Sequence, residues 1–190
     1  MSNLLNLANI EYNVGSLGPG NRIVVWVQGC PFKCKNCISP DWIPFKENNL
    51  ISVETLAADI LQNDFDGLTI SGGEPTMQAS GLAKLLEIVK RQKPETNIIV
   101  FTGFTTDQIK RRTELDEFLQ HVDLLITGLY IDKLNDNKGL RGSSNQEFNY
   151  ITNALLPFKN ELENGERNIE ITPREFSVSY VGIPNKGLHF

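Results

Sequence analysis

The sequence predicts an α/β fold, a partial (β/α) barrel with mostly parallel strands. Short apolar runs rich in β-branched residues alternate with segments of helical periodicity between residues 22 and 126. Such runs are typical of strands that are buried on both faces. Successive strand–helix–strand units form right-handed parallel crossovers, which curve a sheet towards a barrel. We expect residues 1–190 to form a single domain, because this length suits one buried core.

The clearest elements lie in the first two thirds of the chain. Ser52 is a suitable N-cap for the first helix, and the second helix carries a stripe of leucines and valine at helical spacing. We expect strands at residues 22–27, 67–70, 97–101 and 123–126, and helices at residues 52–63, 77–91 and 107–119. The loops that follow parallel strands meet at one edge of a sheet, where such folds place their functional groups.

The pattern weakens after Gly128. Residues 132–146 are polar and rich in glycine and asparagine, which indicates a long loop. Residues 146–156 fit either a helix or a strand, and residues 168–171 and 176–181 fit two late strands, which we expect to be antiparallel.

Charge and hydropathy exclude several classes of partner. The formal net charge is -5, which argues against nucleic acids and anionic membranes, because both require a basic surface. No apolar run approaches the ~18 residues that span a bilayer. Residues 1–11 lack the basic flank, apolar core and cleavage site of a signal peptide. We therefore expect a cytoplasmic protein with no nucleic-acid or membrane partner.

The three cysteines of the chain, Cys30, Cys34 and Cys37, follow the spacing C-x3-C-x2-C. An odd, tightly clustered set is a poor disulfide framework and favours metal binding or catalysis. Three thiolates can hold three corners of an iron–sulfur cube and leave the fourth iron open to a ligand, whereas ferredoxins supply four cysteines. The alternatives are a zinc site completed by His121 or His189, and three unligated cysteines.

These motifs resemble a known family. The cysteine spacing at the end of a first strand resembles the radical S-adenosylmethionine (SAM) superfamily. Further segments resemble the activating enzymes of glycyl radical enzymes, in particular those of anaerobic (class III) ribonucleotide reductases: residues 18–22, 26–31, 71–75, 101–103, 123–128 and 140–146. The resemblance covers most of residues 5–150 and implies a fold of the radical SAM type, a [4Fe-4S] cluster and SAM as cofactors.

Residues 71–75, Ser-Gly-Gly-Glu-Pro, are called here the glycine turn. The resemblance implies that this turn binds the methionine amino group of SAM. Gly72 and Gly73 let the backbone approach a ligand closely, their carbonyls can accept hydrogen bonds from an ammonium group, and Glu74 adds a charged acceptor. The alternative is a plain strand-to-helix turn in which Pro75 starts the helix.

Three further residues are candidates for binding the cofactor. Asn36 stands where the superfamily often has an aromatic residue near adenine, a ring that Phe32 or Trp42 could supply instead. Thr102 ends a strand, where its hydroxyl could meet the ribose or carboxylate of SAM or simply close a turn. Arg141 could contact a carboxylate or the partner protein, or be a solvated loop residue. We expect Arg111 and Arg112 on a solvated helix face.

The resemblance implies an enzyme that cleaves SAM reductively and abstracts hydrogen from a glycine of a large glycyl radical enzyme under anaerobic conditions. A flavodoxin or ferredoxin-type protein would donate the electron. Two alternatives stay open: a radical SAM enzyme that modifies a peptide or small molecule, and a non-catalytic iron–sulfur electron carrier. The glycine turn counts against a carrier, which has no need of a SAM site.

Overall fold

The computed structural model describes residues 3–173 and 178–188. Seven strands form one sheet in the order β3-β1-β2-β4-β5-β6-β7, and two more form a separate hairpin, β8-β9. The strands are β1 (Leu4–Val14), β2 (Arg22–Val27), β3 (Asn49–Ser52), β4 (Gly67–Gly72), β5 (Asn97–Thr102), β6 (Leu124–Thr127), β7 (Glu147–Tyr150), β8 (Ile169–Pro173) and β9 (Val178–Gly182).

The sheet is mostly parallel and open. Strands β2, β4, β5 and β6 pair in parallel in that order. Strands β1 and β7 pair antiparallel to β2 and β6, and β3 pairs antiparallel to β1. Among the described residues β3 and β7 each have one neighbouring strand, so they are free edges and the barrel is not closed. The α/β class and the mostly parallel sheet are confirmed.

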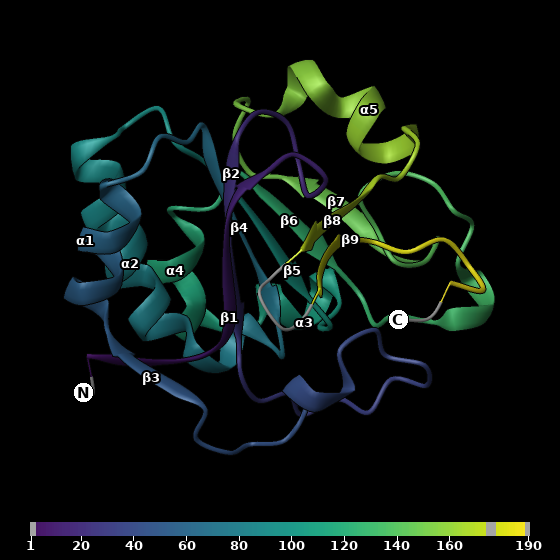
Figure 1. Cartoon of the computed structure of the whole chain (residues 1–190), viewed down its shortest axis with the longest axis horizontal. Coiled ribbons are helices and arrows are strands. Elements are labelled where there is room, and N and C mark those ends of the chain that lie inside the picture. The colour runs from purple at the N-terminus through teal and green to yellow at the C-terminus, as the bar shows by residue number, and fades with distance from the viewer. Residues whose placement is uncertain (1–2, 174–177, 189–190) are drawn as a thin grey trace.

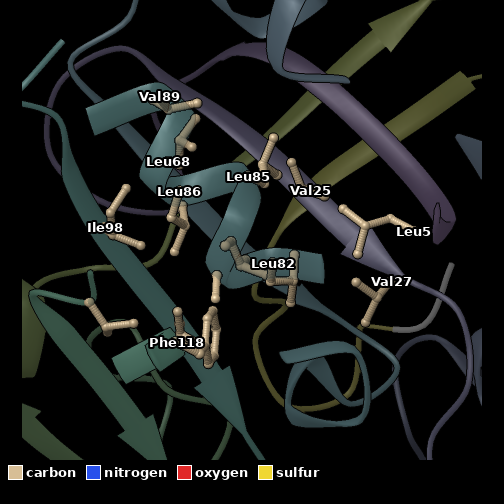
Figure 2. Packing of buried hydrophobic residues seen from close by; sticks show 14 of the residues in the cluster. Leu5, Val25, Val27, Leu68, Leu82, Leu85, Leu86, Val89, Ile98 and Phe118 are labelled. Atoms are coloured by element: carbon tan, nitrogen blue, oxygen red, sulfur yellow. The ribbon is translucent and has the colours of Figure 1, made fainter. Parts of the chain in front are cut away.

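Two different layers cover the two faces of the sheet (Figure 1). Helices α1 (Val53–Leu61), α2 (Ala79–Gln92) and α4 (Asp116–Leu119) lie on one face, and α5 (Lys159–Asn164) and the β8-β9 hairpin lie on the other. Figure 2 shows Leu82, Leu85, Leu86 and Val89 of α2 among strand residues such as Leu68 and Ile98. In the described part of the chain, no helix has the length and apolar character needed to cross a membrane.

Several predicted elements are confirmed. The Ser52 side chain caps α1 by accepting a hydrogen bond from the Thr55 amide. Residues 147–150 form a strand, and β8 and β9 pair antiparallel as expected. Residues 176 and 177 of the second late strand lie outside the described residues.

Two predictions need correction. The helix expected at 107–119 is three short pieces, α3 (Thr106–Lys110), a 3-10 turn (Thr113–Leu115) and α4. The chain turns at Arg111 and Arg112 between the first two pieces. Strands β1 and β3 were not predicted. The polar residues of β1, at positions 6, 9, 11 and 13, do not alternate strictly with apolar ones, and the strand is stabilised by pairing with β2 and β3.

The segment 18–22 has a structural role at the amino edge of the sheet. Arg22 is fully buried, and its guanidinium donates to Thr69 Oγ1 at 2.7 Å, Asn97 Oδ1 at 2.6 Å and the Leu68 carbonyl at 2.6 Å. It also donates to the Pro19 carbonyl at 3.1 Å. Burial lowers the pKa of Arg22 to about 9. These bonds hold β2, β4 and β5 together at the edge opposite the cysteines.

Candidate active site

Four loops meet at the carboxyl edge of the sheet: the cysteine loop (residues 28–48), the glycine turn, residues 103–105 and residues 128–146. The cysteine loop lies below the sheet in Figure 1. The Glu74 amide donates to the Gly29 carbonyl at 2.8 Å, and the Gly128 amide donates to the Phe104 carbonyl at 2.8 Å. Asn36 Nδ2 donates to Asp132 Oδ2 at 3.1 Å. The predicted convergence of these loops is therefore observed.

The cysteine loop folds back on itself. The Gly29 and Cys30 amides donate to the carbonyls of Trp42 and Ile43, each at 2.9 Å. The Cys37 amide donates to the Cys34 carbonyl at 3.2 Å, which makes a tight turn between the second and third cysteines. All three cysteines are free thiols of intermediate burial. The loop therefore presents three unpaired thiols from one short stretch of backbone.

The donor set of this loop is three free thiols, and thiolates are the ligands that hold iron–sulfur clusters. In the described residues no three Cys, His, Asp or Glu side chains are close enough together to hold one metal ion. Burial raises the pKa of Cys30 to about 11, and burial and then Cys37 raise the pKa of Cys34. Metal binding would release these thiol protons.

The zinc alternative finds no partner in His121. This residue lies between α4 and β6 and hence at the amino edge of the sheet, away from the cysteine loop. His189 lies outside the described residues.

The two glycines of the glycine turn allow a close approach between backbones. Gly72 has a φ of 107°, and a Cβ there would lie 2.5 Å from the Val27 amide nitrogen. A Cβ on Gly73 would lie 2.3 Å from the Gly29 carbonyl oxygen. The glycines therefore let this turn pack directly against the residues that lead into Cys30. Contact between their carbonyls and SAM stays a prediction.

Glu74 is buried and fully engaged within the protein. Its Oε1 accepts from the Thr76 amide at 3.0 Å, from Thr76 Oγ1 at 2.8 Å and from Thr102 Oγ1 at 2.8 Å. Its Oε2 accepts from the Gly103 amide at 2.8 Å. Burial raises the pKa of Glu74, and the hydrogen bonds from Gly103 and Thr76 oppose that rise. The carboxylate and the Thr102 hydroxyl thus join the end of β4 to the end of β5.

The aromatic candidates near the cysteines have different neighbours. The Trp42 ring packs against Trp26 with centroids 5.7 Å apart. Phe32 lies edge-on to Phe104 with centroids 4.8 Å apart, and it also borders Gly103. Phe32 therefore connects the cysteine loop to the loop that follows β5.

Arg141 is largely buried in the long loop after β6. Its Nη2 pairs with Asp136 Oδ2 at 2.7 Å, and its guanidinium carbon lies 5.9 Å from the centre of the Phe148 ring. Its Nε is buried without a hydrogen-bond partner among the described residues. Arg141 is therefore not a solvated loop residue in this structure.

The expectation for Arg112 is wrong, whereas Arg111 is exposed as predicted. The Arg112 side chain is 24% exposed, and its Nη1 donates to Thr76 Oγ1 at 3.0 Å. Arg112 lies outside α3, at a non-helical residue before the 3-10 turn, so no helical spacing in the sequence marked its contact with Thr76.

Comparison with known proteins agrees with this site. The 4Fe-4S single cluster domain family matches residues 16–149. The anaerobic ribonucleoside-triphosphate reductase-activating protein of Enterobacteria phage T4 is 34% identical over 134 residues, which is 68% of this chain and 83% of the relative. Its namesake in Pasteurella multocida is also 34% identical, over 68% of this chain and 87% of the relative.

A more distant match is the pyruvate formate-lyase-activating enzyme of Staphylococcus aureus (strain USA300), 30% identical over 65% of this chain and 51% of the relative. The chain thus spans about half the length of that enzyme. Fold and site together define an iron–sulfur protein of the radical SAM class. Within that class the chain belongs to the family of glycyl-radical-enzyme activating proteins that includes the anaerobic ribonucleoside-triphosphate reductase-activating proteins.

Membership of this family implies a [4Fe-4S] cluster and SAM as cofactors, and it identifies the chain as an enzyme. It favours the activase over the peptide-modifying enzyme and over the electron carrier.

Proposed function

We propose that this protein activates an anaerobic ribonucleoside-triphosphate reductase by abstracting a hydrogen atom from a glycine of that enzyme. When bound, the cluster and SAM supply a one-electron cleavage of a carbon–sulfur bond that yields methionine and a 5′-deoxyadenosyl radical. The protein binds, orients and shields these groups.

The observation that carries the proposal is the direct packing of the glycine turn against the cysteine loop. The Glu74 amide bonds to the carbonyl of Gly29, the residue before Cys30. A ligand held by the carbonyls of Gly72 and Gly73 would therefore lie beside the iron that the three cysteines leave open.

Each candidate residue has a proposed part in this site. Cys30, Cys34 and Cys37 hold the cluster, and the glycine turn receives the methionine ammonium group. Glu74 and Thr102 shape that turn through their mutual hydrogen bond. Asn36, beside the third cysteine, would border the adenine, and Arg141 would offer its partly unpaired guanidinium to a carboxylate of SAM or of the partner.

The share of each relative that the chain covers favours a reductase as the partner. The match extends over 83% and 87% of two reductase-activating proteins but over 51% of the pyruvate formate-lyase-activating enzyme. The open sheet leaves room at its edge for a large protein substrate. We further propose a cytoplasmic location and a flavodoxin or ferredoxin-type electron donor.

The proposal is tested by anaerobic reconstitution of the cluster, followed by addition of SAM and a strong reductant and measurement of 5′-deoxyadenosine. We expect nucleoside from the wild-type protein and background amounts from Cys34→Ala, because that variant lacks one cluster ligand. Equal amounts from both proteins would refute SAM cleavage at this site.

The partner is tested by adding either an anaerobic ribonucleotide reductase or a pyruvate formate-lyase to the same mixture. We expect the doublet of a glycyl radical in the EPR spectrum with the reductase and none with the lyase. The opposite result would assign the partner to the lyase class.

A further inference from the structure

Arg112 occupies a position from which it contacts two parts of the candidate site. Its Nη1 donates to Thr76 Oγ1 at 3.0 Å, and its Nε donates to Glu114 at 2.8 Å. Its guanidinium carbon lies 4.7 Å above the centre of the Phe104 ring. Glu114 is 63% exposed, so that ion pair is a surface contact, whereas Thr76 is 4% exposed.

The first contact leads to the glycine turn. The Thr76 hydroxyl has one proton, which it donates to Glu74 Oε1 at 2.8 Å. By donating to the lone pair of that hydroxyl, Arg112 leaves Glu74 as the target of its proton and polarises the bond to the carboxylate. Glu74 in turn receives the Thr102 hydroxyl and the Gly103 amide. Arg112 is therefore linked to the Glu74 carboxylate by two hydrogen bonds through the Thr76 hydroxyl.

The second contact leads to the cysteine loop. Phe104 meets Phe32 at an angle of 68° between the ring planes, an edge-to-face pair. Phe32 lies between Cys30 and Cys34 in the sequence. A cation above an aromatic face is attracted by the quadrupole of the ring. The guanidinium thus holds Phe104 in the orientation that Phe32 packs against.

We propose that Arg112 is a positioning residue that fixes the glycine turn and the cysteine loop relative to each other. The inference rests on the proposed function, because those two segments are the proposed SAM and cluster sites. An arginine suits the position, since its planar guanidinium can lie on an aromatic ring while its edge donates hydrogen bonds in two directions.

The first test uses the cluster-free protein and compares Arg112→Met with Arg111→Met by amide hydrogen exchange. Arg111 is the adjacent, exposed arginine, so both variants lose one charge on the same turn. The reporters are the amides of Thr76 and Gly103, which donate to the Glu74 carboxylate. The control amide is that of Ile98, which donates to the buried Asp123 carboxylate at 2.8 Å.

We expect Arg112→Met to speed exchange at Thr76 and Gly103 about tenfold, equivalent to 1.4 kcal/mol, with Ile98 unchanged. Arg111→Met should leave all three amides as in the wild-type protein. A merely structural role would speed the three amides together through global opening. That result, or no change at Thr76 and Gly103, would overturn the proposal.

The second test uses the reconstituted protein and measures iron content and SAM affinity. We expect Arg112→Met to keep its iron and to bind SAM about tenfold more weakly than Arg111→Met. Thr76→Val, which removes the hydroxyl at nearly constant volume, should reproduce this loss. Equal SAM affinity in Arg112→Met and Arg111→Met would overturn the inference, whereas failure of the wild-type protein to bind SAM would overturn the proposed function instead.

If Arg112→Met does not fold, Arg112→Lys compared with Arg111→Lys decides the question. A lysine keeps the charge but is a point donor, which cannot bond Thr76 while lying flat on Phe104. We expect weaker SAM binding and faster exchange at Thr76 and Gly103 in Arg112→Lys. Identical behaviour of the two lysine variants would overturn the proposal.

Discussion

A charged side chain is buried at the amino ends of the parallel strands and another at their carboxyl ends, and the two have different roles. At the amino edge, Arg22 is fully buried and donates hydrogen bonds to residues of β4 and β5 and to the turn before β2. At the carboxyl edge, Glu74 is 1% exposed and accepts hydrogen bonds from Thr76, Thr102 and Gly103. In both places hydrogen bonds satisfy a charge that burial would otherwise penalise.

The difference lies in what each charge holds. Arg22 joins neighbouring strands of the sheet, so its hydrogen bonds at the amino edge contribute to the stability of the fold alone. The Glu74 carboxylate joins the loops that follow β4 and β5. The Glu74 backbone amide bonds the Gly29 carbonyl at the start of the cysteine loop, which carries three half-buried thiols. The buried Glu74 thus supports the base of the cysteine loop, while the thiols of that loop stay partly accessible. A site for a large substrate requires this arrangement.

Removal of the buried guanidinium at the amino edge should have the largest effect on the free energy of unfolding. Arg22→Met leaves the acceptors on Thr69, Asn97 and Leu68 without their buried donor, so we expect the free energy of unfolding to fall by about 3 kcal/mol or more. Urea unfolding followed by circular dichroism measures this change. Iron uptake per folded chain should stay at the wild-type level.

The matched control is Arg91→Met, because Arg91 is 71% exposed and makes an i,i+4 surface pair with Glu87. It should change the free energy of unfolding by less than about 0.5 kcal/mol. A loss below about 1 kcal/mol in Arg22→Met would show that the amino edge is not the stabilising one.

A substitution at the carboxyl edge should lower the free energy of unfolding less than Arg22→Met does, and should weaken SAM binding more. In Gly73→Ala the new Cβ meets the Gly29 backbone, so we expect about 1–3 kcal/mol of destabilisation and weaker SAM binding, since the residue before Cys30 must move. Thermal unfolding and SAM titration measure the two effects. Gly15→Ala is the control, because a Cβ there meets nothing within 4 Å. Equal SAM affinity in both variants would contradict the close packing of turn and loop.

The smallest effect on stability is expected at Asn36, where two variants separate the contribution of the backbone conformation from that of the side-chain hydrogen bond. This residue has a φ of 58°, and its side-chain amide donates a hydrogen bond to the Asp132 carboxylate. We expect backbone conformation to dominate, so Asn36→Gly should retain wild-type stability within about 0.5 kcal/mol. Asn36→Ala should lose about 1 kcal/mol, because left-handed backbone disfavours a Cβ. Urea unfolding of both variants provides the test. Equal losses would instead assign the role of Asn36 to its bond with Asp132.

Local signals predicted the central strands, the first two helices and the position of the cysteine loop at the carboxyl edge of the sheet. Strand β2 is apolar throughout, and Ser52 caps α1 as its position suggested. Strands β1 and β3 lacked such signals, because half-polar strands depend on a neighbour to pair with. The break at Arg111 and Arg112 was also missed, since the apolar positions of the three short pieces continue one helical pattern.

The sequence by itself determined the class of site, because the cysteine spacing and the glycine turn are local features whose chemistry depends on few residues. The tertiary structure decided what surrounds them. Arg112 and Thr76 are 36 residues apart, and Glu74 and Thr102 are 28 residues apart. Neither bond leaves a periodic pattern in the chain, because such contacts arise only when packing of the sheet brings separate loops to one edge.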